Sequence, residues 1–128
     1  MRDLRLISQN VWAAENVKRF VRENVLNPEF IIESIFTELE LMYLKEYSFN
    51  PKRRWRADYY LPDINTICEV EGATWTQGRH TRGSGYGNDC EKYNSVSIMG
   101  FKLLRYTTDQ IKKDPLRIEK DLRILMEK

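Results

Sequence analysis

Cysteine, histidine and long apolar runs are scarce in this sequence, and each scarcity excludes a class of protein. The two cysteines, Cys68 and Cys90, are too few for the disulfide framework of a small secreted domain. Together with His80, the single histidine, they lack the paired spacing of zinc ligands, which disfavours a zinc site. No apolar stretch approaches the roughly 20 residues of a membrane helix, and residues 1–5 do not begin a signal peptide. We therefore expect a cytoplasmic protein with no membrane partner.

The length and composition favour one globular domain. A chain of 128 residues is large enough for one hydrophobic core and too small for two. Its 41% hydrophobic and 31% charged residues are typical of a globular protein. We expect a single domain over 1–128, with an accessory N-terminal helix within 1–27 and the core over 28–128. The accessory helix is predicted from apolar side chains spaced by three and four residues between Val11 and Val25.

Three carboxylates on two neighbouring predicted strands are the most informative feature. Glu69 and Glu71 project from the same face of their strand, because side chains alternate along a strand. If the preceding strand forms a hairpin with it, Asp58 meets both glutamates. Three converging carboxylates repel one another unless a hard cation neutralises them, and oxygen ligands suit Mg²⁺ or Mn²⁺. The alternative is that these acids form only the solvent face of a half-exposed sheet.

The apolar residues of the glutamate strand favour the metal site over that alternative. Ile67 shares the face of the glutamates, while Ile64, Cys68 and Val70 lie on the opposite face. A strand that is apolar on both faces is a central strand covered on both sides. Two unpaired acids on such a strand are costly to bury, so we expect them to have a function.

Basic residues flank the three acids in the sequence, although the net charge is only +2. A negative centre with positive margins suits a polyanion held around a metal, and aromatic residues lie among the basic ones. A scatter of solvated charges remains the alternative. The basic positions are Lys52, Arg53, Arg54 and Arg56 before the Asp58 strand, and Arg79, His80 and Arg82 after the Glu71 strand.

Hydrophobic periodicity and turn residues predict a mixed sheet with helices on both faces. A helix between the Glu69 strand and the next strand makes these two strands parallel by a right-handed crossover. The first expected elements are a helix from Pro28 to about residue 47 capped by Asn27, a strand from the turn at 50–51 to about Leu61, and the central strand to Glu71. A loop over 72–88 follows, and then a helix that is capped by Asn88 or Asp89, runs to about Met99 and is ended by Gly100. The last elements are a strand over 101–106 and helices that open near Thr107 and Pro115.

Five motifs in series resemble the PD-(D/E)XK nuclease superfamily, in the branch similar to very-short-patch-repair endonucleases and small phage or bacterial endonuclease-domain proteins. The motifs are RRWRAD at 53–58, EVEG at 69–72, GRHTRG at 78–83, DCEKYN at 89–94 and GFKLLRYT at 100–107. The resemblance covers about residues 51–110. It implies a restriction-endonuclease-like core of order α-β-β-β-α-β, in which residues 47–49 supply the strand that periodicity leaves unassigned.

The resemblance also implies roles for the matched residues. Asp58, Glu69 and the main-chain carbonyl of Val70 would bind Mg²⁺ or Mn²⁺ as the cofactor. Glu71 stands where the superfamily usually has lysine, and this is the main departure from the pattern. A glutamate there can bind metal through water or accept a proton from the attacking water. The missing positive charge would then come from Lys92, His80 or Arg82, while Arg53, Arg54, Arg56, Arg79 and Arg82 would bind nucleic acid.

Structural alternatives stand beside several candidate residues. Lys92 is spaced for an ordinary helix-surface ion pair with Asp89, and His80 can be an incidental loop residue. Trp55 is better explained by packing than by base stacking. An additional acid on the second helix would come from Glu33, Glu38 or Glu40, each of which also fits a solvated helix position.

The sequence therefore predicts a metal-dependent DNA endonuclease that hydrolyses phosphodiester bonds. The alternative is a nucleic-acid-binding protein that keeps the nuclease fold without catalysis, and an unrelated phosphoesterase of small nucleotides is a third, weaker hypothesis. DNA is the expected partner. Cutting of both strands would favour a homodimer, with the N-terminal helix as a candidate contact.

Overall fold

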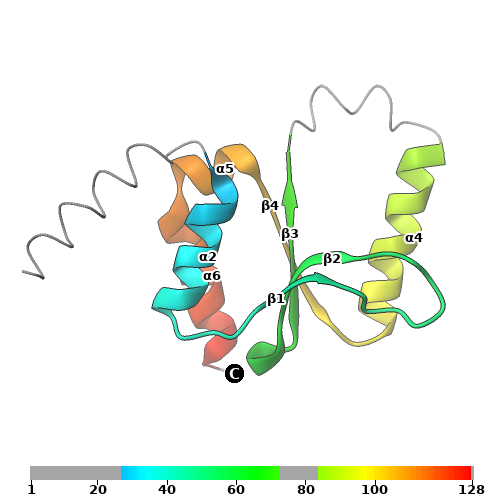
Figure 1. Ribbon diagram of the computed structural model, residues 1–128, viewed down its shortest axis with the longest axis horizontal. Helices are drawn as coiled ribbons and strands as arrows, with labels where there is room; N and C mark the ends of the chain where they lie inside the picture. The colour runs from blue at the N-terminus through cyan, green and yellow to red at the C-terminus, as the bar shows by residue number, and fades with distance from the viewer. Residues whose placement is uncertain (1–26, 73–83, 128) are drawn as a thin grey trace, which may run out of the picture.

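The computed structural model describes residues 27–72 and 84–127, and Figure 1 shows its elements along the chain. From α2 to β4 they follow the order α-β-β-β-α-β, which confirms the predicted core. The helix predicted over 11–25 lies outside the described residues. The elements are α2 (Pro28–Glu38), β1 (Leu44–Tyr47), β2 (Ala57–Leu61), the 3-10 turn η1 (Pro62–Ile64), β3 (Thr66–Glu71), α4 (Ser84–Ile98), β4 (Lys102–Thr107), α5 (Thr108–Lys113) and α6 (Pro115–Met126).

The four strands form one mixed sheet in the order β1-β2-β3-β4. Strand β2 pairs antiparallel with β1 and with β3, and Tyr59 lies opposite Cys68. Strand β3 pairs parallel with β4, and Glu69 lies opposite Arg105. The glutamate strand is therefore an inner strand, as its apolar residues on both faces predict. The parallel pairing confirms the crossover through α4.

Helices cover both faces of the sheet, with α2, α5 and α6 on one side and α4 on the other (Figure 1). On the three-helix side, Tyr59 and Cys68 join a core that includes Phe36 of α2. On the α4 side, Ile67 joins a smaller core that includes Val96. Ile67 and Cys68 are both fully buried although they face opposite ways, which shows that both layers exclude water from β3.

Helix α2 ends at Glu38, so the prediction that it continues to about residue 47 is wrong. Glu40 adopts the left-handed conformation with φ 58° and closes the helix. The Glu40 N–H donates to the Thr37 carbonyl at 3.0 Å, and the Leu41 N–H donates to the Phe36 carbonyl at 2.9 Å. This pair of bonds is a Schellman motif, which usually has glycine at its left-handed position. A glutamate in that position gives no stop signal in the sequence.

Three further boundaries differ from the predictions. The first strand is β1, over Leu44–Tyr47, and starts before the predicted segment 47–49. Strand β2 begins only at Ala57, because residues 51–56 form turns and irregular chain. Helix α4 begins at Ser84, so the end of the loop predicted over 72–88 is helical and neither Asn88 nor Asp89 is its cap.

The helix caps predicted from Asn27, Gly100 and Thr107 are confirmed. Asn27 Oδ1 accepts from the Phe30 N–H, and Thr107 forms a capping box with Gln110. Gly100, with φ 88°, ends α4 in the conformation that glycine favours. Within the two described ranges, no helix is both long and apolar enough to cross a membrane.

Candidate active site

Strands β2 and β3 stop pairing regularly at the two predicted metal ligands. Their ladder ends with Tyr59 opposite Cys68. Beyond it, side chains replace main-chain partners: the Asp58 N–H donates to Glu69 Oε2 at 2.7 Å, and the Val70 N–H donates to Asp58 Oδ2 at 2.8 Å. Each carboxylate is thus held by the main chain of the opposite strand. The exchange fixes Asp58 and Glu69 side by side, as the hairpin prediction requires.

The neighbouring edge strand is also distorted beside Asp58. Glu46 of β1 has φ 51°, a left-handed conformation that costs a non-glycine residue about 1 kcal/mol or more. Glu46 and Asp58 line a cavity of about 120 Å³, together with Glu29, Lys45 and Val70. Glu29 comes from the first turn of α2. Glu29 was not predicted, because nothing in its local pattern distinguishes it from an ordinary acid at a helix N-terminus.

Glu69 is 4% exposed and is surrounded by polar partners. Lys92 Nζ of α4 lies 2.5 Å from Glu69 Oε1, and the Tyr93 hydroxyl donates to the same oxygen at 3.3 Å. Burial raises the pKa of Glu69, and the charge of Asp58 raises it further. The hydrogen bond from the Asp58 N–H and the charge of Lys92 lower the pKa, but it stays above its ordinary value. The ion pair of Lys92 is therefore with Glu69, not with Asp89 as the alternative reading proposed.

Glu71 does not join the other two acids. The Arg105 Nε donates to Glu71 Oε1 at 2.8 Å, and Nη2 of the same guanidinium also contacts that oxygen. The Arg105 guanidinium carbon lies 4.1 Å from the centre of the Tyr93 ring. The expected convergence of all three carboxylates is therefore corrected to a pair, because β4 brings a cation to Glu71. Arg105 falls within the matched motif at 100–107, but no role was predicted for it.

The donor atoms of the pair fit a hard divalent cation. Two carboxylates stand next to each other, and burial, together with the charge of Asp58, raises the pKa of Glu69. Mg²⁺ is commonly held by one or two carboxylates while it keeps several waters. Within 27–72 and 84–127, no group of three or more Asp, Glu, His or Cys side chains is arranged around a common metal position. The site therefore fits a metal ion through the chemistry of its ligand atoms, which come from two acids.

The contacts of Glu33 hold a helix against the sheet. Its carboxylate accepts from the Tyr59 hydroxyl at 2.7 Å and from the Tyr43 hydroxyl at 3.2 Å, and Lys45 Nζ lies 3.0 Å away. Burial raises the pKa of Glu33, but these donors and the Lys45 charge outweigh it and hold the pKa below its ordinary value. Glu33 therefore ties α2 to β1 and β2. The other two helix candidates, Glu38 and Glu40, are exposed.

The predicted basic margins are only partly described. Arg53 pairs with Glu91 at 3.2 Å, and its guanidinium carbon lies 3.9 Å from the centre of the Trp55 ring. Arg54 and Arg56 are exposed, as cations that bind a polyanion must be. Trp55 packs against the smaller core, in agreement with the packing interpretation. The second margin, Arg79, His80 and Arg82, lies outside the described residues.

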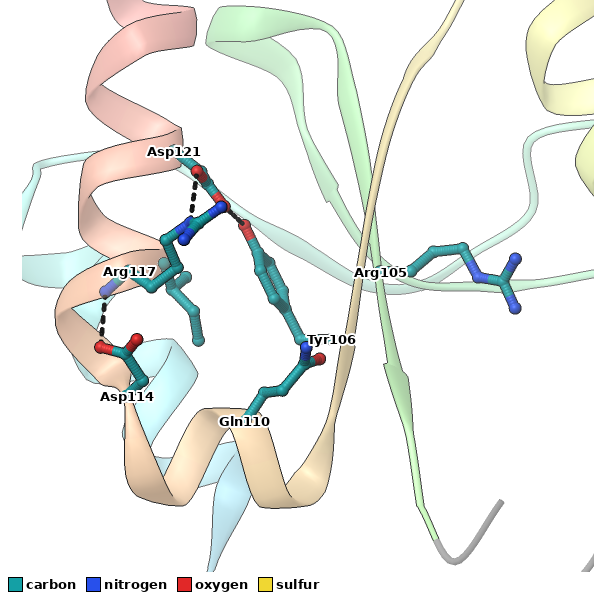
Figure 2. Close-up of a pocket in the computed structure, with 7 residues that line it drawn as sticks. Arg105, Tyr106, Gln110, Asp114, Arg117 and Asp121 are labelled. Atoms are coloured by element: carbon teal, nitrogen blue, oxygen red, sulfur yellow. Dashed lines mark hydrogen bonds and ion pairs between the residues drawn. The ribbon is translucent and has the colours of Figure 1, made fainter. Parts of the chain in front are cut away.

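A larger cavity of about 340 Å³ lies behind β4, away from the acid pair. Figure 2 shows that Tyr106 points into this cavity while Arg105 points to the other side of the strand. The Tyr106 hydroxyl donates to Asp121 at 2.7 Å, and Arg117 pairs with the same carboxylate at 3.4 Å. These groups bind β4 to α6, so the polar side chains named here pair with one another and hold the fold together.

Comparison with known proteins identifies a solved structure with a similar fold. No family model and no curated protein sequence match this chain. Among solved structures, it is similar to the catalytic domain of the homing endonuclease I-Bth0305I, with a TM-score of 0.59 and 18% sequence identity. The likeness covers 77% of this chain and 91% of that domain. It shows that the chain has the α/β fold of a nuclease catalytic domain, and function must be argued from the site.

Proposed function

We propose that this protein is a metal-dependent DNA endonuclease that hydrolyses phosphodiester bonds. The observation that carries the proposal is the Asp58–Glu69 pair, held by exchanged hydrogen bonds with Lys92 on the Glu69 carboxylate. A carboxylate pair with an adjacent cation suits phosphoryl chemistry, in which negative charge develops on the phosphate oxygens. The fold supports the proposal, because the similar solved structure is itself the catalytic domain of an endonuclease.

In this proposal Asp58, Glu69 and the main-chain carbonyl of Val70 hold Mg²⁺ or Mn²⁺. When bound, the ion polarises the scissile phosphate and lowers the pKa of the attacking water. Lys92 supplies the cation that the resemblance expects at the position of Glu71. Its ammonium group has three donors, so besides Glu69 it can bind the attacking water or a phosphate oxygen. The side chain is 17% exposed, which strengthens its charge interactions relative to those on the surface.

The remaining predicted residues take supporting roles. Glu71, held by Arg105, accepts a proton from water or binds the metal through water. His80 is a further acid–base candidate, since its ordinary pKa lies close to neutral pH. Binding of DNA is assigned to Arg53, Arg54, Arg56, Arg79 and Arg82.

One observation favours the second candidate, a nucleic-acid-binding protein without catalysis. Glu71 occupies the usual lysine position, and its charge is matched by Arg105. Such a protein would bind DNA with a steep dependence on salt and would cut it in no divalent metal. The two candidates therefore differ in one measurable outcome.

Plasmid cleavage by the purified full chain tests the proposal. We expect nicking or cutting in Mg²⁺ or Mn²⁺ that stops in EDTA and falls at least about 100-fold in Asp58→Asn, because the amide keeps the shape of the ligand and loses its charge. Asp109→Asn is the matched control, since Asp109 is an exposed acid on α5. Undiminished cutting by Asp58→Asn would contradict the proposal. DNA binding without any cutting by the wild-type protein would support the second candidate.

The predicted homodimer is measured in the same preparation. A linear product formed without accumulation of the nicked circle means that both strands are cut in one encounter, which two copies of the site accomplish most simply. Light scattering with and without DNA then reports the number of chains in the particle.

A further inference from the structure

A groove of about 470 Å³ lies next to the candidate active site, between residues 50–55 and the C-terminal half of α4. Its volume falls within the roughly 300–1,000 Å³ of small-ligand sites. Polar and apolar side chains line it together, with Glu91, Asn94 and Ile98 coming from one side of α4 and Arg53 and Trp55 from the segment before β2. A mixed lining of this kind suits a flat ligand with a polar edge.

Arg53 gives the groove a planar wall. Its guanidinium carbon lies 3.9 Å from the centre of the Trp55 ring, and Trp55 in turn stacks on the buried ring of Phe49 at 6.4 Å between centroids. Glu91 binds the guanidinium at 3.2 Å and neutralises it. With its charge matched, Arg53 attracts a phosphate less than a free arginine does, while its flat face remains a surface on which a nucleobase can stack.

The hydrogen-bonding groups of the groove select among bases. Glu91 uses Oε2 for Arg53, and its other carboxylate oxygen can accept from an amino group. Asn94 follows Glu91 by three residues and is exposed on the same side of the helix. A carboxylate accepts from the amino group of cytosine, and an asparagine amide matches the amino group and ring nitrogen of adenine. Guanine also carries an exocyclic amino group, whereas thymine offers only a ring N–H to these acceptors.

Both walls of the groove lie close in sequence to residues of the candidate active site. Glu91 directly precedes Lys92, whose ammonium group lies on Glu69. Trp55 lies three residues before Asp58 along the chain. Because consecutive Cα atoms are about 3.8 Å apart, these short chain separations allow a strand whose phosphate sits at the acid pair to place a neighbouring nucleotide at the groove.

We propose that this groove holds an unpaired DNA base with an exocyclic amino group beside the phosphate that is cut. The base stacks on the Arg53 guanidinium, and its amino group donates to Glu91. The proposal deepens the nuclease function and rests on it for the position of the cut. Its binding chemistry is independent of catalysis, so the two are tested separately.

The test measures binding of short single-stranded oligonucleotides to the full chain by fluorescence anisotropy in EDTA, where no metal-dependent cutting occurs. Each amino-bearing base is compared with its analogue lacking only that group: adenine with purine, guanine with hypoxanthine, and cytosine with 2-pyrimidinone. We expect about tenfold tighter binding of the amino-bearing member in at least one pair, as for one charge-assisted hydrogen bond. Equal binding within all three pairs would overturn the proposal.

Glu91→Ala provides a readout that a purely structural role would not give. It removes the acceptor and frees Arg53, so the preference for the amino-bearing base should disappear while overall affinity rises and its salt dependence steepens. Ser97→Ala, an exposed α4 residue outside the groove, is the matched control and should keep the preference. A preference that survives Glu91→Ala would overturn the proposal. Because cutting is absent from this assay, a failure of the nuclease proposal leaves the result unaffected.

Discussion

Two glutamates, Glu33 and Glu69, have similar partners and opposite electrostatic properties. Each pairs with a lysine and accepts a hydrogen bond from at least one tyrosine hydroxyl. The side chain of Glu33 is 23% exposed and that of Glu69 is 5% exposed. The partners are Lys45, Tyr43 and Tyr59 for Glu33, and Lys92, Tyr93 and the Asp58 N–H for Glu69.

The pKa values of the two carboxyls move in opposite directions. Burial opposes ionisation of both, but the donors around Glu33 outweigh it and lower the pKa. At Glu69 burial is the largest influence, and the charge of Asp58 adds to it, so the pKa rises. The surroundings of Glu33 thus stabilise its ionised form, whereas those of Glu69 disfavour ionisation. A carboxyl whose ionised form is disfavoured in this way is the one that a bound cation is expected to stabilise.

The largest expected contrast is between Glu69→Gln and Glu33→Gln. Glu69→Gln removes a proposed metal ligand, so cleavage should fall at least about 100-fold. Glu33→Gln breaks the acceptor set that joins α2 to the sheet, so it should lower the free energy of unfolding by about 1–2 kcal/mol with little change in the cleavage rate of the folded protein. Plasmid cleavage and urea unfolding measure both effects on each variant. A strong loss of cleavage in folded Glu33→Gln would remove the distinction between the two sites.

The two lysines sharpen the same comparison with a smaller effect. Lys92→Met keeps a long apolar side chain in place of a proposed catalytic cation, and we expect at least about a tenfold loss of cleavage at saturating metal. Lys45→Met removes the half-exposed partner of Glu33 and should leave the cleavage rate unchanged. Single-turnover cleavage separates the two variants. Wild-type rates in Lys92→Met would assign its ion pair to folding alone.

The pH dependence of stability should have opposite signs at the two glutamates. A lowered carboxyl pKa contributes stability that is present above the unfolded value near 4.5 and is lost as pH falls through the folded value. Glu33→Gln should therefore cost more stability at pH 7 than at acid pH. A raised pKa contributes stability that is present below the unfolded value and is lost as pH rises through the folded value. Glu69→Gln should accordingly gain on the wild-type protein as pH rises.

Unfolding curves of both variants and the wild type between pH 3.5 and 7 would provide the test, since this range brackets the ordinary carboxyl pKa of about 4.3. Parallel pH profiles for the two substitutions would contradict the assignment of opposite shifts. Added Mg²⁺ should raise the stability of the wild-type protein at pH 7 more than at acid pH, because protons compete with the ion for Glu69.

The fold was predictable where its signals are local. Gly100 and Glu40 occupy the same left-handed position of the same helix-ending motif. Glycine marks that position in a sequence, so the end of α4 was found. Glutamate does not mark it, so the end of α2 and the start of β1 were missed. The apolar run over Thr66–Glu71, in contrast, identified β3 and its inner place in the sheet.

The site was predictable to the extent that strand alternation determines it. Asp58 and Glu69 were expected to meet and do so, because the hairpin register brings them together. Lys92 was one of several candidates for the missing cation, and only the packing of α4 places it on Glu69. The pairing of Glu71 with Arg105 depends on a parallel strand far along the chain, and no local pattern contains that information.

The smallest expected effect concerns the pair of Glu71 and Arg105. Arg105 is 45% exposed, so water screens the pair and its loss should cost at most about 1 kcal/mol of stability. Cleavage distinguishes the two partners better than stability does. If Glu71 accepts a proton from water or holds a metal-bound water, Glu71→Gln should slow cleavage in Mg²⁺ while Arg105→Gln, which leaves that carboxylate in place, slows it much less. If Glu71 only balances the charge of Arg105, both substitutions should have the same small effect, and the double variant should match either single one. Single-turnover rates of the four proteins decide between these roles, and equal rates for both single variants would restrict the catalytic acids to Asp58 and Glu69.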